Sequence, residues 1–262
     1  AEQSSATHRL VTRAAGPDHP QCSTQRLAHR ARMASHMAST PLRGVAVVIG
    51  YGPGIGASVA RKWSREGYSV ALLSRSAEKL ASGAAEIPNS TPFVADVTDD
   101  RALTKALEDV EARLGALDTI IYNAGSGTFK TYDDLHLEDL DRALRTNCHG
   151  LLSATKYACP RMEARGTGCV IVTGATASLR GKPRTTAFAA AKSAQRSLAQ
   201  SLARQLGPKN VHVAYVIIDG GVGKADGRID PDAIADTYFA IQQQPKSCWT
   251  FELDVRPSVE SW

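Results

Sequence analysis

From residue 42 onward, short apolar runs rich in β-branched residues alternate with longer stretches whose apolar residues recur at helical spacing. One such stretch carries Leu198, Leu202 and Leu206 at four-residue intervals and ends at Gly207. The apolar runs predict strands at residues 45–49, 68–73, 91–95, 119–122, 169–173 and 211–218, and an edge strand within 249–255. Helices are predicted between them, including a long one over 137–164 and another that ends at 206.

The strands are almost continuously apolar, whereas a strand wetted on one face would alternate polar and apolar residues. Strands of this kind that alternate with helices predict a parallel sheet covered on both faces. The expected fold class is therefore α/β, a Rossmann-like doubly wound parallel sheet in three layers that forms a single domain over residues 42–262. Ligands of such sheets bind at the carboxyl ends of the strands, so functional residues are expected directly after each strand.

Residues 1–41 form an N-terminal extension of a different composition. Its first forty residues contain five Arg and only two acids, Glu2 and Asp18, with many Ser, Thr and His. This composition is typical of a transit segment and indicates an organelle, either mitochondrion or plastid. Two alternatives stay open, in which the protein is otherwise cytoplasmic: a translated leader, or residues added for expression ahead of a natural start at Met37.

Charge, cysteine and hydropathy patterns exclude several classes of partner. The net charge of +5 falls to +2 once the +3 of the first forty residues is subtracted, and no basic face follows, so no nucleic-acid partner is expected. The five cysteines are widely spaced without a CxxC pair, and no metal site is expected. No apolar run reaches the roughly 20 residues of a membrane span.

A glycine-rich turn follows the first strand and leads into a helix. Its spacing is GxxxGxG, formed by Gly50, Gly54 and Gly56, with Ile55 between the last two. In a dinucleotide site these glycines turn the chain, let the backbone approach the pyrophosphate and allow close packing at the helix N-terminus. A plain turn is the alternative for this motif alone. A P-loop is not expected because no Lys-Ser/Thr pair follows.

Further motifs follow the later strands in a fixed order, and together they resemble the short-chain dehydrogenase/reductase family over residues 44–220. They are Asp96 and Val97 after the third strand, Asn123, Ala124 and Gly125 after the fourth, Asn147 with Gly150 in the long helix, and Lys192 in the following helix. The resemblance implies a nicotinamide cofactor contacted by these residues, with Lys192 at its ribose. Val222, after the sixth strand, is a further expected cofactor contact.

The end of the second strand indicates which nicotinamide cofactor is preferred. A site for NAD usually has a carboxylate there, whereas this chain has Ser74 and Arg75. A guanidinium can hold a 2′-phosphate through charge-assisted hydrogen bonds, so NADP(H) is the expected cofactor. The alternative is a solvated surface arginine, since Pro53 stands where NADP-preferring relatives often carry a second base.

The catalytic residues implied by the resemblance are incomplete. Phe188 occupies the position of the tyrosine that donates or accepts the proton, and Ala175 that of the serine. A phenyl ring has no ionisable hydrogen, so carbonyl reduction should be slower by roughly 10²- to 10⁴-fold. Asn147 and Lys192 remain as expected catalytic residues. Among the nearby hydroxyls of Thr173, Thr176 and Ser178, the last is favoured, with an ordinary turn serine as its alternative.

Departures continue beyond the sixth strand. The family's Pro-Gly is replaced by Asp219-Gly220, Lys224 stands where a threonine usually meets the cofactor, and residues 223–230 are too few for the usual helical lid. A poorly covered site excludes water less well. Three basic residues after the fifth strand either attract an anionic substrate or belong to a solvated loop; they are Arg180, Lys182 and Arg184.

Two functions fit these observations. The first is an NADP(H)-dependent oxidoreductase of low or unusual activity on an unknown substrate, with its proton from Ser178, water or the substrate. The second is a catalytically degenerate NADP(H)-binding protein that serves as a structural or redox-sensing subunit of a larger organellar complex. In either case the small and apolar residues of the helices near 147–164 and 186–206 predict a homo-oligomer or a subunit of a complex.

Overall fold

The computed structural model describes residues 42–260. The transit-segment prediction concerns residues 1–41 and lies outside the described residues. Within 42–260, no helix is both long enough and apolar enough to cross a membrane.

Seven parallel strands form one sheet in the order β3-β2-β1-β4-β5-β6-β7. The strands are β1 (Val45–Ile49), β2 (Ser69–Ser74), β3 (Ser90–Val94), β4 (Leu117–Tyr122), β5 (Gly168–Thr173), β6 (Val211–Ile218) and β7 (Glu252–Val255). The chain order reverses between β1 and β4, where a doubly wound sheet opens its ligand crevice. The predicted α/β, three-layer, Rossmann-like fold is confirmed, and β7 is the expected edge strand.

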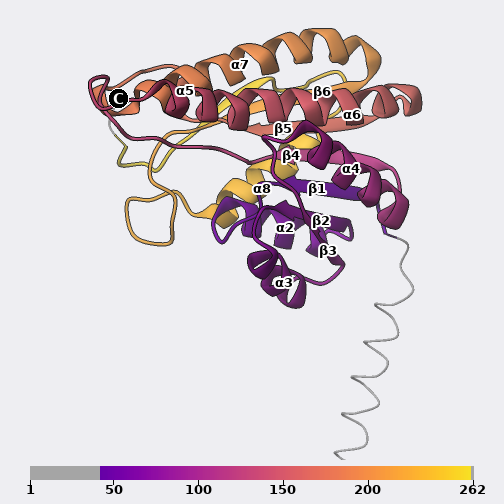
Figure 1. Ribbon diagram of the computed structural model, residues 1–262. Coiled ribbons are helices and arrows are strands. Elements are labelled where there is room, and N and C mark those ends of the chain that lie inside the picture. Colours follow the sequence, from indigo (N-terminus) through magenta and orange to yellow (C-terminus); the bar gives the residue numbers. More distant parts are fainter. Residues whose placement is uncertain (1–41, 261–262) are drawn as a thin grey trace, which may run out of the picture. The chain divides into compact units, whose positions relative to one another are not determined.

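Helices cover both faces of the sheet. One face carries α4 (Asp100–Leu114), α6 (Gly150–Arg165) and α7 (Thr186–Leu206), and the other carries α2 (Ile55–Arg65), α3 (Ala77–Glu86) and α8 (Pro231–Gln242). Figure 1 shows α6 and α7 running together on one side of the strands and α2 and α3 on the other. The short helix α5 (Leu137–Leu144) precedes α6.

Alternate residues of each strand supply the two apolar cores. In β1, Val45, Val47 and Ile49 face the core beneath α4, α6 and α7, whereas Ala46 and Val48 face the core beneath α2 and α8. All five side chains are buried. Burial on both faces explains why these strands are apolar without alternation.

The long helix predicted over 137–164 is divided by a π-helical turn. Between α5 and α6, residues Arg145–His149 form the π-helix η1, and the backbone N–H of Gly150 donates to the carbonyl of Arg145, five residues earlier. The Nδ2 of Asn147 donates to the carbonyl of Ala143 at 2.8 Å. Such turns occur often at functional sites, and this one carries the asparagine singled out from the sequence.

Candidate cofactor and active site

The glycine-rich turn between β1 and α2 is tightly held by neighbouring backbone. Gly50 has φ +91°, and a Cβ there would lie 2.5 Å from the Cα of Ala124, so only glycine fits. A Cβ on Gly56 would lie 3.1 Å from the carbonyl oxygen of Gly50. Gly54 is the N-cap of α2, and no atom lies within 4 Å of where its Cβ would be. The turn thus leaves open space at the positive end of an 11-residue helix.

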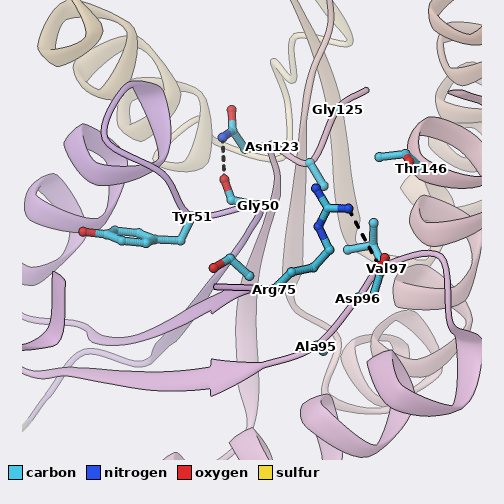
Figure 2. A pocket seen from close by; sticks show the side chains of 11 residues that line it. Gly50, Tyr51, Arg75, Ala95, Asp96, Val97, Asn123, Gly125 and Thr146 are labelled. Atoms are coloured by element: carbon cyan, nitrogen blue, oxygen red, sulfur yellow. Dashed lines mark hydrogen bonds and ion pairs between the residues drawn. The ribbon is translucent and has the colours of Figure 1, made fainter. Parts of the chain in front are cut away.

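A cavity of about 200 Å³ lies at the carboxyl ends of β1 to β4. Its walls are Gly50, Tyr51, Ser74, Arg75, Ala95, Asp96, Val97, Asn123, Ala124, Gly125 and Thr146. These residues lie at the carboxyl ends of β1 to β4 or on η1, and Figure 2 shows their side chains around the cavity. Most of the cofactor residues expected from the sequence are therefore brought together here. Tyr51, Ala95 and Thr146 also line this cavity and were not singled out from the sequence.

Two side chains at the end of β2 present donors to this cavity. The Nη1 of Arg75 lies 3.9 Å from the Oδ2 of Asp96, a loose ion pair, and the Arg75 side chain is 77% exposed. The Oγ of Ser74 is buried and has no hydrogen-bond partner among the described residues. The Oδ1 of Asp96 accepts from the backbone N–H and the hydroxyl of Thr98, each at 2.9 Å. Arg75 and Ser74 therefore keep hydrogen-bonding capacity for a ligand.

Asn123 ties the glycine-rich turn to the middle of the sheet. Its Nδ2 donates to the carbonyl of Gly50 at 2.9 Å, and its Oδ1 accepts from the hydroxyl of Thr173 at 3.1 Å. The Thr173 hydroxyl in turn accepts from the Tyr238 hydroxyl of α8 at 2.9 Å. These hydrogen bonds connect the turn after β1 with the ends of β4 and β5 and with α8, which lies near the C-terminal end of the sequence.

A second cavity, of about 470 Å³, continues from the first and shares Asn123 and Gly125 with it. It lies between the loops that follow β4, β5 and β6. The remaining wall residues are Ile55, Gly127, Phe129, Thr173, Gly174, Ala175, Thr176, Ala177, Phe188, Lys192, Ile218 and Gly220. Ile55 joins this second cavity rather than the first.

Lys192 is the buried cation of this second cavity. Its Nζ donates to the carbonyl of Thr173 at 2.8 Å and to the Oε1 of Gln195 at 2.9 Å. Burial lowers the pKa of Lys192 to about 7, because the ammonium form loses its hydration. Gln195 in turn donates from Nε2 to the backbone carbonyl of Asn147 at 2.9 Å. Lys192 and Asn147, both expected from the sequence, are therefore joined through Gln195, which was not.

The amide of Asn147 offers an acceptor to the same region. Its Nδ2 is used on the carbonyls of Ala143 and Ser126, while its Oδ1 is buried with no partner among the described residues. A Cβ on Gly125 would lie 3.6 Å from that Oδ1 and 3.7 Å from the Nζ of Lys192. Both atoms thus lie beside the one glycine that the two cavities share.

The groups near the second cavity that bear on proton transfer are the ring of Phe188 and the hydroxyls of Ser178 and Thr176. The ring of Phe188 lies in the wall, 6.0 Å from the Nζ of Lys192 and 5.6 Å from the ring of Phe129. Ser178 is buried and is not among the residues that line the second cavity, and its Oγ donates to the carbonyl of Ala175 at 2.7 Å. The Thr176 hydroxyl, which does line the cavity, donates to the carboxylate of Asp219.

Beyond β6 the chain forms an ion-pair cluster and a short loop. Asp219 is buried and pairs with Arg180 at 3.2 Å and with Arg256 at 2.8 Å. Arg180 and Lys182 line an adjoining cavity of about 320 Å³, and Arg184 does not. Val222 pairs with Ile229 and packs against an apolar core, so it lines neither the first nor the second cavity. The loop over residues 223–230 contains no helix, in keeping with the predicted short lid.

The donors and acceptors of the site suit a dinucleotide and do not suit a metal ion. Within residues 42–260 no cluster of His, Cys, Asp or Glu could hold a metal ion. A dinucleotide fits, because the turn at Gly50 and Gly54 leaves space at a helix N-terminus, and Ser74 Oγ and Asn147 Oδ1 are buried without partners among the described residues. Fold and site together define a dinucleotide-binding α/β protein.

Comparisons with known proteins narrow this class. The family model described as short chain dehydrogenase matches residues 44–225, and the chain belongs to the short-chain dehydrogenase/reductase family. Oxidoreductase asL5 of Sarocladium schorii is 32% identical over 169 residues, which are 64% of this chain and 68% of that protein. This family accounts for the order of motifs along β1 to β5.

Solved structures of short-chain dehydrogenases and oxidoreductases are similar to this chain in fold and sequence. A short-chain dehydrogenase from Rhodopseudomonas palustris is 36% identical with a TM-score of 0.76, covering 83% of this chain and 100% of that one. A metagenomic short-chain oxidoreductase in complex with NADP is 28% identical with a TM-score of 0.76, covering 84% and 100% of the two chains. The protein is therefore an oxidoreductase of the short-chain dehydrogenase/reductase type.

Proposed function

We propose that this protein is an NADP(H)-dependent oxidoreductase of low intrinsic turnover that acts on a carbonyl compound or the corresponding alcohol. The observation that carries the cofactor choice is the end of β2, where Arg75 and the unpartnered Oγ of Ser74 line the first cavity. A carboxylate at this point would repel a 2′-phosphate, whereas a guanidinium attracts it. The NADP complex of the metagenomic relative supports this choice.

When bound, the cofactor would supply or accept a hydride, and this chain's residues would hold it along the two joined cavities. Gly54 and Gly56 would admit the phosphates at the start of α2, and Asp96 and Val97 would contact the adenine. The loop after β4 and Lys192 would border the nicotinamide end. The residues proposed to bind the cofactor are Gly50, Gly54, Ile55, Gly56, Ser74, Arg75, Asp96, Val97, Asn123, Ala124, Gly125 and Lys192.

Low turnover is proposed because the second cavity lacks a good proton donor at the usual place. Phe188 carries no ionisable hydrogen, and Ser178 already donates a hydrogen bond to the carbonyl of Ala175 and does not line the second cavity. The remaining titratable group of that wall is Lys192, whose pKa of about 7 allows its ammonium form to release a proton near neutrality. A proton from Lys192 or from water would therefore complete carbonyl reduction.

Calorimetry with NADPH and NADH tests the cofactor choice. We expect NADPH to bind at least about tenfold more tightly, a gap of about 1.4 kcal/mol, and Arg75→Ala to remove that gap. Arg204→Ala, at an exposed position of α7 away from both cavities, is the matched control and should keep the preference. Equal affinities of the wild-type protein for the two cofactors would refute the assignment.

A cofactor-binding subunit without turnover is the second candidate, and Phe188 is the observation that favours it. In this case the protein would act as a structural or redox-sensing subunit, in an organelle if residues 1–41 are a transit segment. Single-turnover oxidation of bound NADPH against a panel of carbonyl compounds and enones separates the two functions. A rate above that of NADPH in buffer with any panel member supports the oxidoreductase, and none with any member supports the subunit.

A homo-oligomer is proposed for either function. Helix α7 carries an exposed small residue, Ala194, and Leu152 of α6 is 41% exposed, whereas Ala154 of α6 is buried in the chain's own core. Small residues allow the close approach of helices, and an exposed leucine gains free energy when a partner covers it. Light scattering at micromolar concentration tests the proposal, and a monodisperse species with the mass of one chain would contradict it.

A further inference from the structure

Lys192 has an unusual set of partners for a buried lysine. Its Nζ donates to two uncharged acceptors, the carbonyl of Thr173 at 2.8 Å and the Oε1 of Gln195 at 2.9 Å. A neutral amine has two N–H groups and one lone pair. Because both N–H groups are occupied by these acceptors, the lone pair is directed away from them.

The second cavity adjoins this lysine. Lys192 lines it, and its Nζ lies 3.7 Å from where a Cβ on Gly125 would be, in the same wall. The wall contains two aromatic rings, those of Phe129 and Phe188, and no carboxylate. A space of about 470 Å³ bordered by phenyl rings suits an uncharged molecule with an apolar substituent.

The surroundings also keep much of this amine neutral near pH 7. Burial is the largest cause of the lowered pKa of Lys192, and the thiol of Cys148 on η1 opposes it weakly. The other titratable groups nearby are the hydroxyl of Tyr215 on β6, which donates to the carbonyl of Lys192, and the hydroxyl of Tyr238 on α8, which donates to Thr173. Both tyrosines have raised pKa values and stay uncharged, so neither adds a negative charge that would hold the ammonium form.

We propose that Lys192 captures aldehydes and ketones covalently, as imines, when no cofactor occupies the site. The lone pair of Nζ attacks the carbonyl carbon, a C–N bond forms, and the π electrons of the carbonyl move to oxygen. A proton passes from nitrogen to that oxygen to give a carbinolamine, and loss of water leaves a C=N bond. The step needs no oxidant or reductant, and hydrolysis reverses it. Buried lysines with a lowered pKa are suited to this chemistry.

Capture and cofactor binding would exclude one another. Lys192 borders both Gly125 and the buried Oδ1 of Asn147, where the nicotinamide end of the cofactor is proposed to lie. An imine at Nζ would fill that space, and a bound cofactor would cover the lone pair. The protein would therefore exist in two states, one carrying a carbonyl compound and the other carrying NADP(H).

Reductive trapping tests the capture directly and needs no turnover. The full chain is incubated with benzaldehyde and cyanoborohydride at pH 7, and the modified lysines are located by peptide mass spectrometry. We expect a benzyl group on Lys192 at a rate at least tenfold above that of Lys79 and Lys156, which are exposed and serve as controls within the same chain. Lys192→Arg should lose this modification and keep that of the two controls.

The pH dependence and a cofactor arm complete the experiment. Trapping at Lys192 should rise with pH around a midpoint near 7. Saturating NADP⁺ should slow trapping at Lys192 at least tenfold and leave Lys156 unchanged. A wild-type chain modified at Lys156 but not at Lys192 in the absence of cofactor overturns the capture. Trapping that persists under bound NADP⁺ overturns the mutual exclusion.

Discussion

The two cavities of the site are built in different ways. The cavity over β1 to β4 depends largely on backbone, with Gly50 at φ +91° and Gly54 at the start of α2, supported by the amide of Asn123. The cavity beyond β5 depends on single side chains, among them Lys192, Phe188 and Phe129. The shape of the first cavity depends on many backbone atoms, whereas proton donation in the second cavity would depend on a single atom.

This difference means that one substitution can remove a proton donor more easily than it can remove the glycine-rich turn. Phenylalanine and tyrosine differ by a single oxygen, and the ring of Phe188 packs against Phe129 at 5.6 Å. The fold would therefore tolerate either side chain at this position. A comparable change at Gly50 would force the backbone of the loop after β4 to move, because a Cβ there meets Ala124. Binding and catalysis thus differ in how easily substitution can remove them.

Gly50→Ala should have the largest effect. A Cβ there meets the backbone of Ala124 and has to adopt a positive φ, so we expect a loss of at least about 2 kcal/mol in the free energy of unfolding. NADPH binding should weaken at least about 100-fold, because the turn can no longer close on the cofactor. Urea unfolding and calorimetry measure the two effects.

The control for that experiment is Gly52→Ala in the same turn. No atom lies within 4 Å of where its Cβ would be, so stability and affinity should change by less than about 1 kcal/mol. If the two variants behaved alike, the view that backbone geometry defines the first cavity would be wrong.

Phe188→Tyr should have the next largest effect, on activity alone. A phenol beside Lys192 restores a proton donor, and we expect NADPH-dependent reduction of a reactive diketone to rise about 100-fold, a typical gain for general acid catalysis. Phe129→Tyr, in the same wall, is the control and should give less than about a tenth of that gain. A wild-type turnover already within about 1 to 10³ per second would show that the missing phenol does not limit the protein.

The fold and the first cavity could be predicted from the sequence because their determinants are local. Apolar runs such as 45–49 predict buried parallel strands. Parallel strands bring their carboxyl ends to one edge of the sheet, so Gly50, Arg75 and Asp96 were expected to lie close together there, as they do. Spacing along the chain and the topology of the sheet were sufficient.

The second cavity could be predicted only in part, since its details depend on loop packing. Ser178 follows β5 as expected, but a 3₁₀ turn at Thr176–Ser178 buries its hydroxyl against Ala175. Gln195 meets Asn147 only because the π-helix η1 and α7 lie together, a contact between residues 48 positions apart. The contact between Gln195 and Asn147 cannot be predicted from periodicity in the sequence.

The ion-pair cluster after β6 gives a prediction of moderate size. Asp219→Ala leaves two guanidinium groups without their buried carboxylate, and we expect a loss of about 2 kcal/mol in the free energy of unfolding. Fully buried pairs typically lose roughly 3–5 kcal/mol, and the 41% exposure of Arg180 reduces the effect.

The control is Asp109→Ala, which removes an exposed pair with Lys105 and should cost less than about 1 kcal/mol. Urea unfolding compares the two variants. Equal losses would mean that the cluster after β6 contributes no more than a surface ion pair.

The smallest predicted effect is a pH dependence due to Lys192. Its pKa is about 7 in the folded protein and 10.5 as a free side chain, so between these values the unfolded chain binds a proton that the folded protein has released. Stability should therefore rise with pH in this window, by at most about 1.4 kcal/mol per pH unit.

Comparison with Lys192→Met separates the contribution of Lys192 to the pH dependence of stability from the contributions of other titrating groups. The free energy of unfolding of the wild type relative to that variant should increase by about 1 kcal/mol between pH 8 and 9. Lys156→Met, at an exposed position of α6, should show no such change. A flat difference for Lys192→Met would place the pKa of Lys192 near its ordinary value.

The π-helix η1 also bears on how this site can evolve. A π-turn is equivalent to one residue inserted into an α-helix, and here Gly150 bonds to Arg145 rather than to Thr146. Deleting one residue from 145–149 would restore a regular helix and keep the later residues of α6 in nearly the same orientation relative to α5, because the wide turn absorbs the extra residue. The extra residue in η1 therefore sets the position of Asn147 with little effect on the packing of α6, so that a deletion there would change the site while leaving the rest of the fold in place.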